Sequence, residues 1–96
     1  MKIDFTKNNG TLTVALDGRL DTITAPDLEK FLGEKYAETD MLIVDCDKLT
    51  YISSAGLRVL LAAQKKTKGA MKLINVGELV MEVFEMTGFA DILVIE

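Results

Sequence analysis

Residues 45–61 read DCDKLTYISSAGLRVLL, and this stretch does most to decide the fold. The apolar run at 41–44 before it is typical of a central strand buried on both faces, which the acids and a loop are expected to end. The hydroxyls of Ser53 and Ser54 then stand where a helix must begin, because three leucines follow at helical spacing. The pattern predicts a serine exposed at the positive end of a helix, a favourable position for a phosphate.

Composition limits the class of protein. The 96 residues are expected to form one domain, residues 1–96, and a hydrophobic fraction of 49% is enough for a genuine core. The formal net charge of −4, with no basic stripe, argues against a nucleic-acid partner. No apolar run approaches the roughly 18 residues of a membrane span, and no signal-peptide pattern is present. We therefore expect a cytoplasmic protein without direct membrane contact.

Few residues of the chain could support catalysis or bind a metal. Histidine is absent, and the single cysteine, Cys46, is expected to be a small buried hydrophobe rather than a redox thiol. Asp45 and Asp47 could form an acid–base or magnesium pair. Because no glycine-rich phosphate loop and no third acid at a metal-binding spacing accompany them, we interpret them as strand-end acids. The expectation is a protein that is not an enzyme, with no catalytic residue, no metal and no other cofactor.

The rest of the chain alternates strands and helices around this centre. The predicted elements are an antiparallel hairpin over 2–7 and 12–16, a helix from about Thr24 to about Glu38, a strand over 41–44 continuing towards Cys46, the helix after Ser54, a strand over 71–74, a helix over 78–87 and a short strand over 92–95. The order is β-β-α-β-α-β-α-β. Because strands joined by helical crossovers are normally parallel, we predict an α/β fold with a mixed β-sheet, parallel beyond the hairpin, and with helices packed against it.

Local patterns predict further details of these elements. Thr24 is expected to cap the first helix, and Gly18 is expected to break the second strand of the hairpin. In the helix over 78–87, Leu79, Val83 and Phe84 are expected to face the core while the glutamates face solvent.

Three blocks of sequence carry a resemblance to a known family. They are GRLDTITA at 18–25, the stretch at 45–61 and FEMTGF at 84–89. Together they make the chain similar, over essentially its whole length, to the STAS domain of bacterial anti-sigma factor antagonists, also called anti-anti-sigma factors. The resemblance implies a STAS-like fold of the mixed α/β kind predicted above.

The resemblance also implies a regulatory cycle. In this family the unphosphorylated antagonist binds an anti-sigma factor that is also a serine kinase, and the sigma factor is released. The kinase phosphorylates a serine of the antagonist, which ends binding, and a metal-dependent phosphatase of the PP2C type restores it. Alignment on Gly56 and Leu57 places that serine at Ser54. Ser53, which stands where the family has an acid, is an alternative acceptor.

Each of these residues also has a plainer structural interpretation. Ser54 could be a helix N-cap, and Asp21 could close a loop by accepting hydrogen bonds from nearby amides. Gly56 costs helix propensity, so we expect it to allow close approach of another chain's backbone over the serine. Arg58 could dock the partner, steady a phosphate or simply be exposed. The predicted partner-binding residues are Asp21, Thr22, Thr24, Ser53, Ser54, Ala55, Gly56, Leu57 and Arg58.

Two other classes of function stay open from the sequence. The chain could be a non-switching STAS scaffold or an accessory subunit of a transport system, using the same surface to recognise a partner. A small enzyme or nucleotide-binding domain is the third class.

Overall fold

The computed structural model describes residues 1–37 and 39–96. Its elements are β1 (Lys2–Asn8), β2 (Thr11–Leu20), α1 (Ala25–Lys35), β3 (Met41–Ile52), α2 (Ser54–Lys66), β4 (Met71–Ile74), α3 (Glu78–Thr87) and a short 3₁₀ helix, η1 (Phe89–Asp91). The first helix was expected to reach about Glu38, a residue outside the described ranges, and α1 ends at Lys35.

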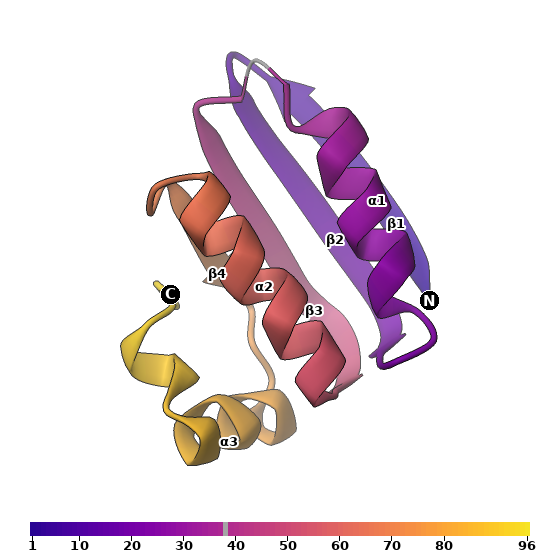
Figure 1. Ribbon diagram of the computed structural model, residues 1–96, viewed down its shortest axis with the longest axis vertical. Helices are drawn as coiled ribbons and strands as arrows, with labels where there is room; N and C mark the ends of the chain where they lie inside the picture. The colour runs from indigo at the N-terminus through magenta and orange to yellow at the C-terminus, as the bar shows by residue number, and fades with distance from the viewer. Residues whose placement is uncertain (38) are drawn as a thin grey trace.

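The sheet has the predicted mixed topology. Its strand order is β1-β2-β3-β4, with β1 antiparallel to β2 and the other neighbours parallel. Helices α1 and α2 lie side by side on one face of the sheet (Figure 1). Helix α3 packs near the carboxyl end of β3, where residues of the two elements line a common groove. The α/β fold class is therefore confirmed.

Alternation along the two central strands explains the core. In β2 the side chains of Leu12, Val14 and Leu16 are buried, and in β3 those of Leu42 and Val44 are buried, while the residues between them are half-buried. This period of two places one face of the sheet against α1 and α2. The prediction that the strand at 41–44 is buried on both faces is wrong, because its other face remains half-exposed.

The loop expected before Ser53 does not form, because β3 continues to Ile52. The acids and lysine of 45–48 stay in the strand, and two register shifts between β2 and β3 accommodate them. Gly18 lies beside the second shift and does not end β2, which runs to Leu20. Its φ of +112° is one that glycine adopts without strain, so the residue absorbs an irregularity inside the strand.

The C-terminal third departs from two predictions. In α3 the buried residues are Val80 and Phe84, one helical turn apart, whereas Leu79 is exposed. The final strand expected over 92–95 is replaced by η1 and a single parallel bridge between Leu73 and Ile95. The chain therefore covers the β4 edge with a short irregular segment instead of a full strand. Within 1–37 and 39–96, no helix is long and apolar enough to cross a membrane.

Candidate functional site

The corner between β3 and α2 is built from two adjacent serines with different roles. Ser53 is the N-cap of α2, since its backbone is extended and its Oγ accepts a hydrogen bond of 3.4 Å from the Gly56 N–H. Ser54 is the first residue of α2 and is exposed. The interpretation of Ser54 as the cap is therefore wrong, because the cap belongs to Ser53. What remains at Ser54 is an exposed hydroxyl at the positive end of a helix.

Gly56 is buried under this corner, and the reason lies within the chain. A Cβ atom at this position would meet the Leu20 side chain at 2.8 Å and both the Ile52 side chain and the Leu20 carbonyl oxygen at 2.9 Å. The expectation that glycine makes room for another chain's backbone is therefore wrong. The ends of β2 and β3 occupy that space, and the missing side chain lets α2 start directly against them.

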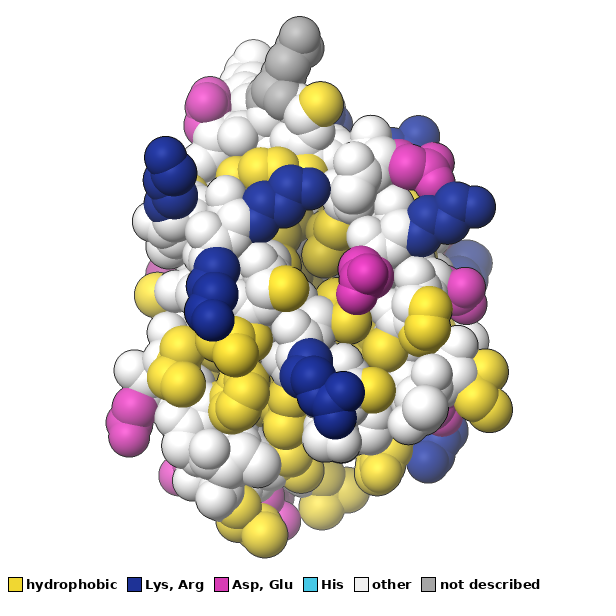
Figure 2. Space-filling model, viewed as in Figure 1, with side chains coloured by type: hydrophobic (Ala, Val, Ile, Leu, Met, Phe, Trp, Pro, Cys, Tyr) yellow, Lys and Arg dark blue, Asp and Glu magenta, His cyan; other side chains and the backbone are white. Residues whose placement is uncertain are grey.

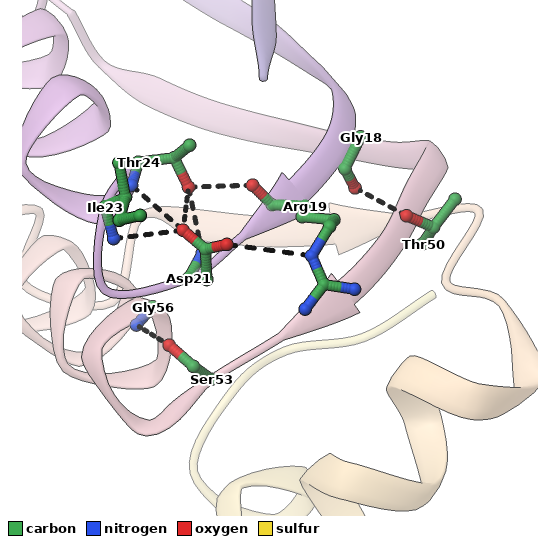
Figure 3. Close-up of polar contacts among 8 residues, drawn as sticks. All are labelled: Gly18, Arg19, Asp21, Ile23, Thr24, Thr50, Ser53 and Gly56. Atoms are coloured by element: carbon green, nitrogen blue, oxygen red, sulfur yellow. Dashed lines mark hydrogen bonds and ion pairs between the residues drawn. The ribbon is translucent and has the colours of Figure 1, made fainter.

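The Asp21 loop lies beside the serine corner because β2 and β3 end together. Leu20 pairs with Ile52 in the sheet, and the Ser53 N–H donates a 2.9 Å hydrogen bond to the Leu20 carbonyl. The residues that follow each strand, Asp21 and Ser53, are therefore neighbours in space (Figure 3). Two of the predicted site segments, far apart in sequence, meet at one end of the sheet.

Asp21 closes its own loop. Its Oδ1 accepts hydrogen bonds from the N–H groups of Ile23 (3.0 Å) and Thr24 (3.1 Å), and its Oδ2 lies 3.6 Å from Nε of Arg19. The Thr24 hydroxyl donates to the Arg19 carbonyl at 2.7 Å and accepts from the Asp21 N–H at 2.9 Å. Thr24 occupies the N-cap position of α1, as predicted, but its side chain makes no hydrogen bond to the first turn of the helix. The predicted position is therefore confirmed and the predicted capping bond is wrong.

These contacts hold the pKa of the Asp21 carboxyl below its ordinary value. The main cause is the hydrogen bond from the Thr24 N–H, followed among the lowering contacts by the bond from Ile23, while partial desolvation acts in the opposite direction. The ionised carboxylate is thus the form that the loop stabilises, and the loop-closing interpretation of Asp21 is confirmed.

The other predicted residues differ in how far they reach the surface. Thr22, Ala55 and Arg58 line a groove between α1 and α2, next to Ser54 in sequence and structure. Leu57 is buried in the core. Its side chain, like the glycine at 56, supports the corner from below and is not available to a partner. The predicted residues with surface exposure are Asp21, Thr22, Thr24, Ser53, Ser54, Ala55 and Arg58.

Sequence reasoning missed a neighbouring apolar surface. The guanidinium of Arg19 stacks over the Tyr51 ring, 4.1 Å from its centroid, and Tyr51 is partly exposed. Leu79 and Met86 on α3 are 70% and 86% exposed. The available signal was their spacing of seven residues, which places both on one helical face. The prediction that Leu79 faces the core is therefore wrong.

Asp45, Asp47 and Cys46 have structural surroundings. The Oδ1 of Asp45 accepts hydrogen bonds from Nδ2 of Asn75 (3.1 Å) and from the Asp47 N–H (3.0 Å). No group of acids, cysteines or histidines in the described residues has the arrangement of a metal site. Burial, together with the Asp45 charge, raises the pKa of the Cys46 thiol to about 12, so the thiolate is disfavoured at neutral pH.

The serine corner and the Asp21 loop together form one polar surface at the end of the sheet. An exposed hydroxyl lies at a helix N-terminus, on a surface shared with a rigid polar loop. The STAS domain family model matches residues 2–96. The chain belongs to the STAS domain family.

The curated relatives of this STAS domain include anti-sigma factor antagonists. BtrV of Bordetella bronchiseptica, assigned as an anti-sigma factor antagonist, is 36% identical over 96 residues, which cover 96% of this chain and 83% of BtrV. The anti-sigma-B factor antagonist of Bacillus subtilis is 32% identical over 99 residues, covering 97% of this chain and 88% of that protein.

Solved structures show the same fold. The anti-sigma factor antagonist SpoIIAA from Bacillus, in its unphosphorylated form, superposes with a TM-score of 0.83 at 16% identity, covering 99% of this chain and 88% of SpoIIAA. Its phosphorylated form superposes with a TM-score of 0.75 at 15% identity, covering 99% and 91%. At these identities the likeness establishes the fold alone.

Proposed function

We propose that this chain is an anti-sigma factor antagonist that works as a phosphorylation switch. In its unphosphorylated form it binds an anti-sigma factor with serine kinase activity, and the sigma factor is released. The kinase then phosphorylates Ser54, which ends binding, and a PP2C-type phosphatase removes the phosphate. Residues 1–96 act in the cytoplasm as a single STAS domain with a regulatory role and no catalysis of their own.

The observation that carries the proposal is the exposed hydroxyl of Ser54 at the first position of α2. Such a hydroxyl can enter the active site of another enzyme without local unfolding. The Ser53 hydroxyl is half-buried and engaged with the Gly56 N–H, so its phosphorylation would remove the cap of α2. This difference favours Ser54 over Ser53 as the acceptor.

Phosphorylation at Ser54 would leave the fold intact and change the surface. A phosphate carries about −1.5 to −2 charges at neutral pH, and the positive end of α2 stabilises negative charge. The same charge and bulk stand beside the Asp21 carboxylate, on the surface proposed to dock the partner. Binding is therefore lost because the added charge and bulk change the docking surface, and not because the domain unfolds.

The site of modification can be tested directly. Each serine-kinase anti-sigma factor encoded in the source genome is purified and incubated with the chain and Mg-ATP. Trypsin cleaves after Lys48 and Arg58, so both serines fall in one peptide, residues 49–58. We expect one phosphate, assigned to Ser54 by fragmentation, that persists in Ser53→Ala and disappears in Ser54→Ala. Phosphorylation of Ser53 alone would contradict the proposal. So would the absence of phosphate from both serines with all of the kinases.

The effect on binding is tested with a pair of variants that differ only in charge. Ser54→Asp and Ser54→Asn have side chains of nearly equal shape, and we expect at least tenfold weaker binding of the same anti-sigma factor by the Asp variant than by the Asn variant. Both are expected to keep the native melting temperature within a few degrees. Equal binding by the two variants would instead favour a non-switching STAS scaffold or an accessory subunit of a transport system.

A further inference from the structure

An apolar groove lies between the end of β3 and helix α3. Tyr51 and Ile52 line its β3 side, and Leu79, Val83 and Met86 line its α3 side. Figure 2 shows apolar side chains gathered at the lower end of the molecule, where α3 and the end of β3 lie. Leu79 and Met86 are 70% and 86% exposed, and together with the groove they form an apolar patch of the kind that binds partners.

Negative charge lies along the α3 side of the groove. Glu82 lines it directly, and Glu78 and Glu85 are exposed on the same helix. Among the ion pairs formed within the described residues, none includes these three glutamates. A binding partner with Lys or Arg beside an apolar segment would therefore be complementary in charge. A second copy of this chain, placed with its α3 face to face, would oppose one row of glutamates to another.

The groove and the serine corner meet at the end of β3. Ile52 lines the groove and is followed at once by Ser53, and Tyr51 carries the stacked guanidinium of Arg19. Arg19 also lies 3.6 Å from the Asp21 carboxylate. Arg19 therefore links the Asp21 loop to Tyr51 in the groove, and a partner on the Asp21 loop has only this side chain to pass.

We propose that the groove binds an apolar segment, flanked by Lys or Arg, of the same anti-sigma factor that phosphorylates Ser54. This inference rests on the proposed function and adds to it a second contact with the partner, separate from the contact at Ser54. The groove supplies apolar contact area and the glutamates orient the partner, so the kinase is held while its active site meets Ser54.

The first test removes the apolar side chains. The double variant Leu79→Ser/Met86→Ser changes exposed positions only, so we expect it to fold with a melting temperature close to that of the native chain. Ile92→Ser/Val94→Ser is the matched control, since these side chains are 47% and 46% exposed outside the groove. The probe is the purified anti-sigma factor that phosphorylates Ser54 in the assay above. We expect at least tenfold weaker binding for the groove variant, mostly through faster dissociation, and less than a threefold change for the control.

The second test asks whether α3 is in contact with the kinase. Methionine oxidation by dilute peroxide follows exposure, so Met86 is expected to react quickly in the free chain. In the complex we expect at least fivefold protection of Met86. Met41, half-buried at the opposite end of β3, is expected to react equally in both states. Full reactivity of Met86 in the complex would overturn the inference.

The third test reverses charge. Glu82→Lys is expected to weaken binding at least threefold at low salt, whereas Glu34→Lys on α1 is expected to leave it unchanged. The outcomes separate the two proposals. If Ser54→Asp abolishes binding while the Leu79/Met86 variant binds like the native chain, only the groove proposal fails. If no serine-kinase anti-sigma factor binds the native chain, both proposals fail.

Discussion

Two helices, α1 and α2, begin at the same end of the sheet but satisfy the polar groups at their starts differently. Before α1, the Asp21 carboxylate accepts a hydrogen bond from the Thr24 N–H, while the Thr24 hydroxyl accepts one from the Asp21 N–H and donates one to the Arg19 carbonyl. Before α2, a single hydroxyl, that of Ser53, accepts one hydrogen bond of 3.4 Å from the Gly56 N–H.

The two helix starts suit different roles, because the start of α1 is a fixed scaffold and the start of α2 presents the proposed phosphate acceptor. The start of α1 uses its polar side chains internally, so the Asp21 loop keeps its shape and offers a fixed surface. The start of α2 uses only Ser53 and leaves the next hydroxyl, on Ser54, exposed. A switch needs both kinds of region, because the modified group must be accessible while the surface around it remains in place.

The largest expected effect comes from the packing beneath α2. Gly56→Ala places a Cβ atom within 2.9 Å of Leu20 and Ile52, which should lower the free energy of unfolding by about 1–3 kcal/mol. Gly33→Ala in α1 is the control, because a Cβ there meets no heavy atom within 4 Å. That variant should gain up to about 1 kcal/mol through helix propensity. Urea unfolding of both variants measures the contrast.

If Gly56→Ala were as stable as Gly33→Ala, the close packing of α2 on β2 and β3 would not be the reason for the glycine. The original expectation of a partner's backbone over the serine would then regain support.

The same contrast shows which features sequence could predict. Alternation predicted the hairpin and the strand at 71–74, and helical spacing placed α2. The stretch at 45–50 has the polar composition of a loop, and only pairing with β2 through register shifts keeps it in a strand. That pairing is a tertiary effect that composition does not contain. Likewise, Ser53 and Ser54 are both good caps, and the choice depends on where β3 ends.

The residues around the groove illustrate a different limit. Leu79 and Val80 are equally apolar neighbours, so periodicity alone could assign either to the core. The structure buries Val80 with Phe84, one turn apart, and exposes Leu79. Sequence therefore predicted the helix, but the rotation of that helix about its axis was decided by packing against the sheet.

The next effect tests the scaffold at α1. Asp21→Ala removes the acceptor of two backbone N–H bonds, so we expect a lower melting temperature than that of the native chain at pH 7. Because the pKa of this carboxyl is lowered in the folded state, its contribution is complete above the unfolded value and is lost as pH falls below about 4. The difference between variant and native chain should therefore narrow on acidification.

Asp47→Ala is the matched control for that experiment, because it removes an exposed carboxylate of β3. Thermal unfolding by circular dichroism from pH 3 to pH 7 gives the comparison. A gap between Asp21→Ala and the native chain that stays constant over this range would contradict the role given to the carboxylate.

A smaller effect is expected at the cap of α2. Ser53→Ala removes one long hydrogen bond to the Gly56 N–H, which should cost about 0.5–1 kcal/mol of unfolding free energy. Ser53→Asp should recover this loss, since aspartate is also a good cap and its charge suits the positive helix end. If Ser53→Asp were no more stable than Ser53→Ala, the capping role of position 53 would be in error.

The smallest effect on stability should be at Ser54 itself, where stability and phosphorylation are expected to separate most clearly. An exposed hydroxyl that caps nothing contributes little to folding, so Ser54→Ala should change the free energy of unfolding by less than about 0.5 kcal/mol. The same substitution should abolish phosphorylation by the anti-sigma kinase.

Urea unfolding and the kinase assay, run on one preparation beside Ser53→Ala, separate the two serines. Ser53→Ala should lose stability and keep its phosphate, whereas Ser54→Ala should keep stability and lose the phosphate. The opposite pattern would assign the reactive hydroxyl to Ser53.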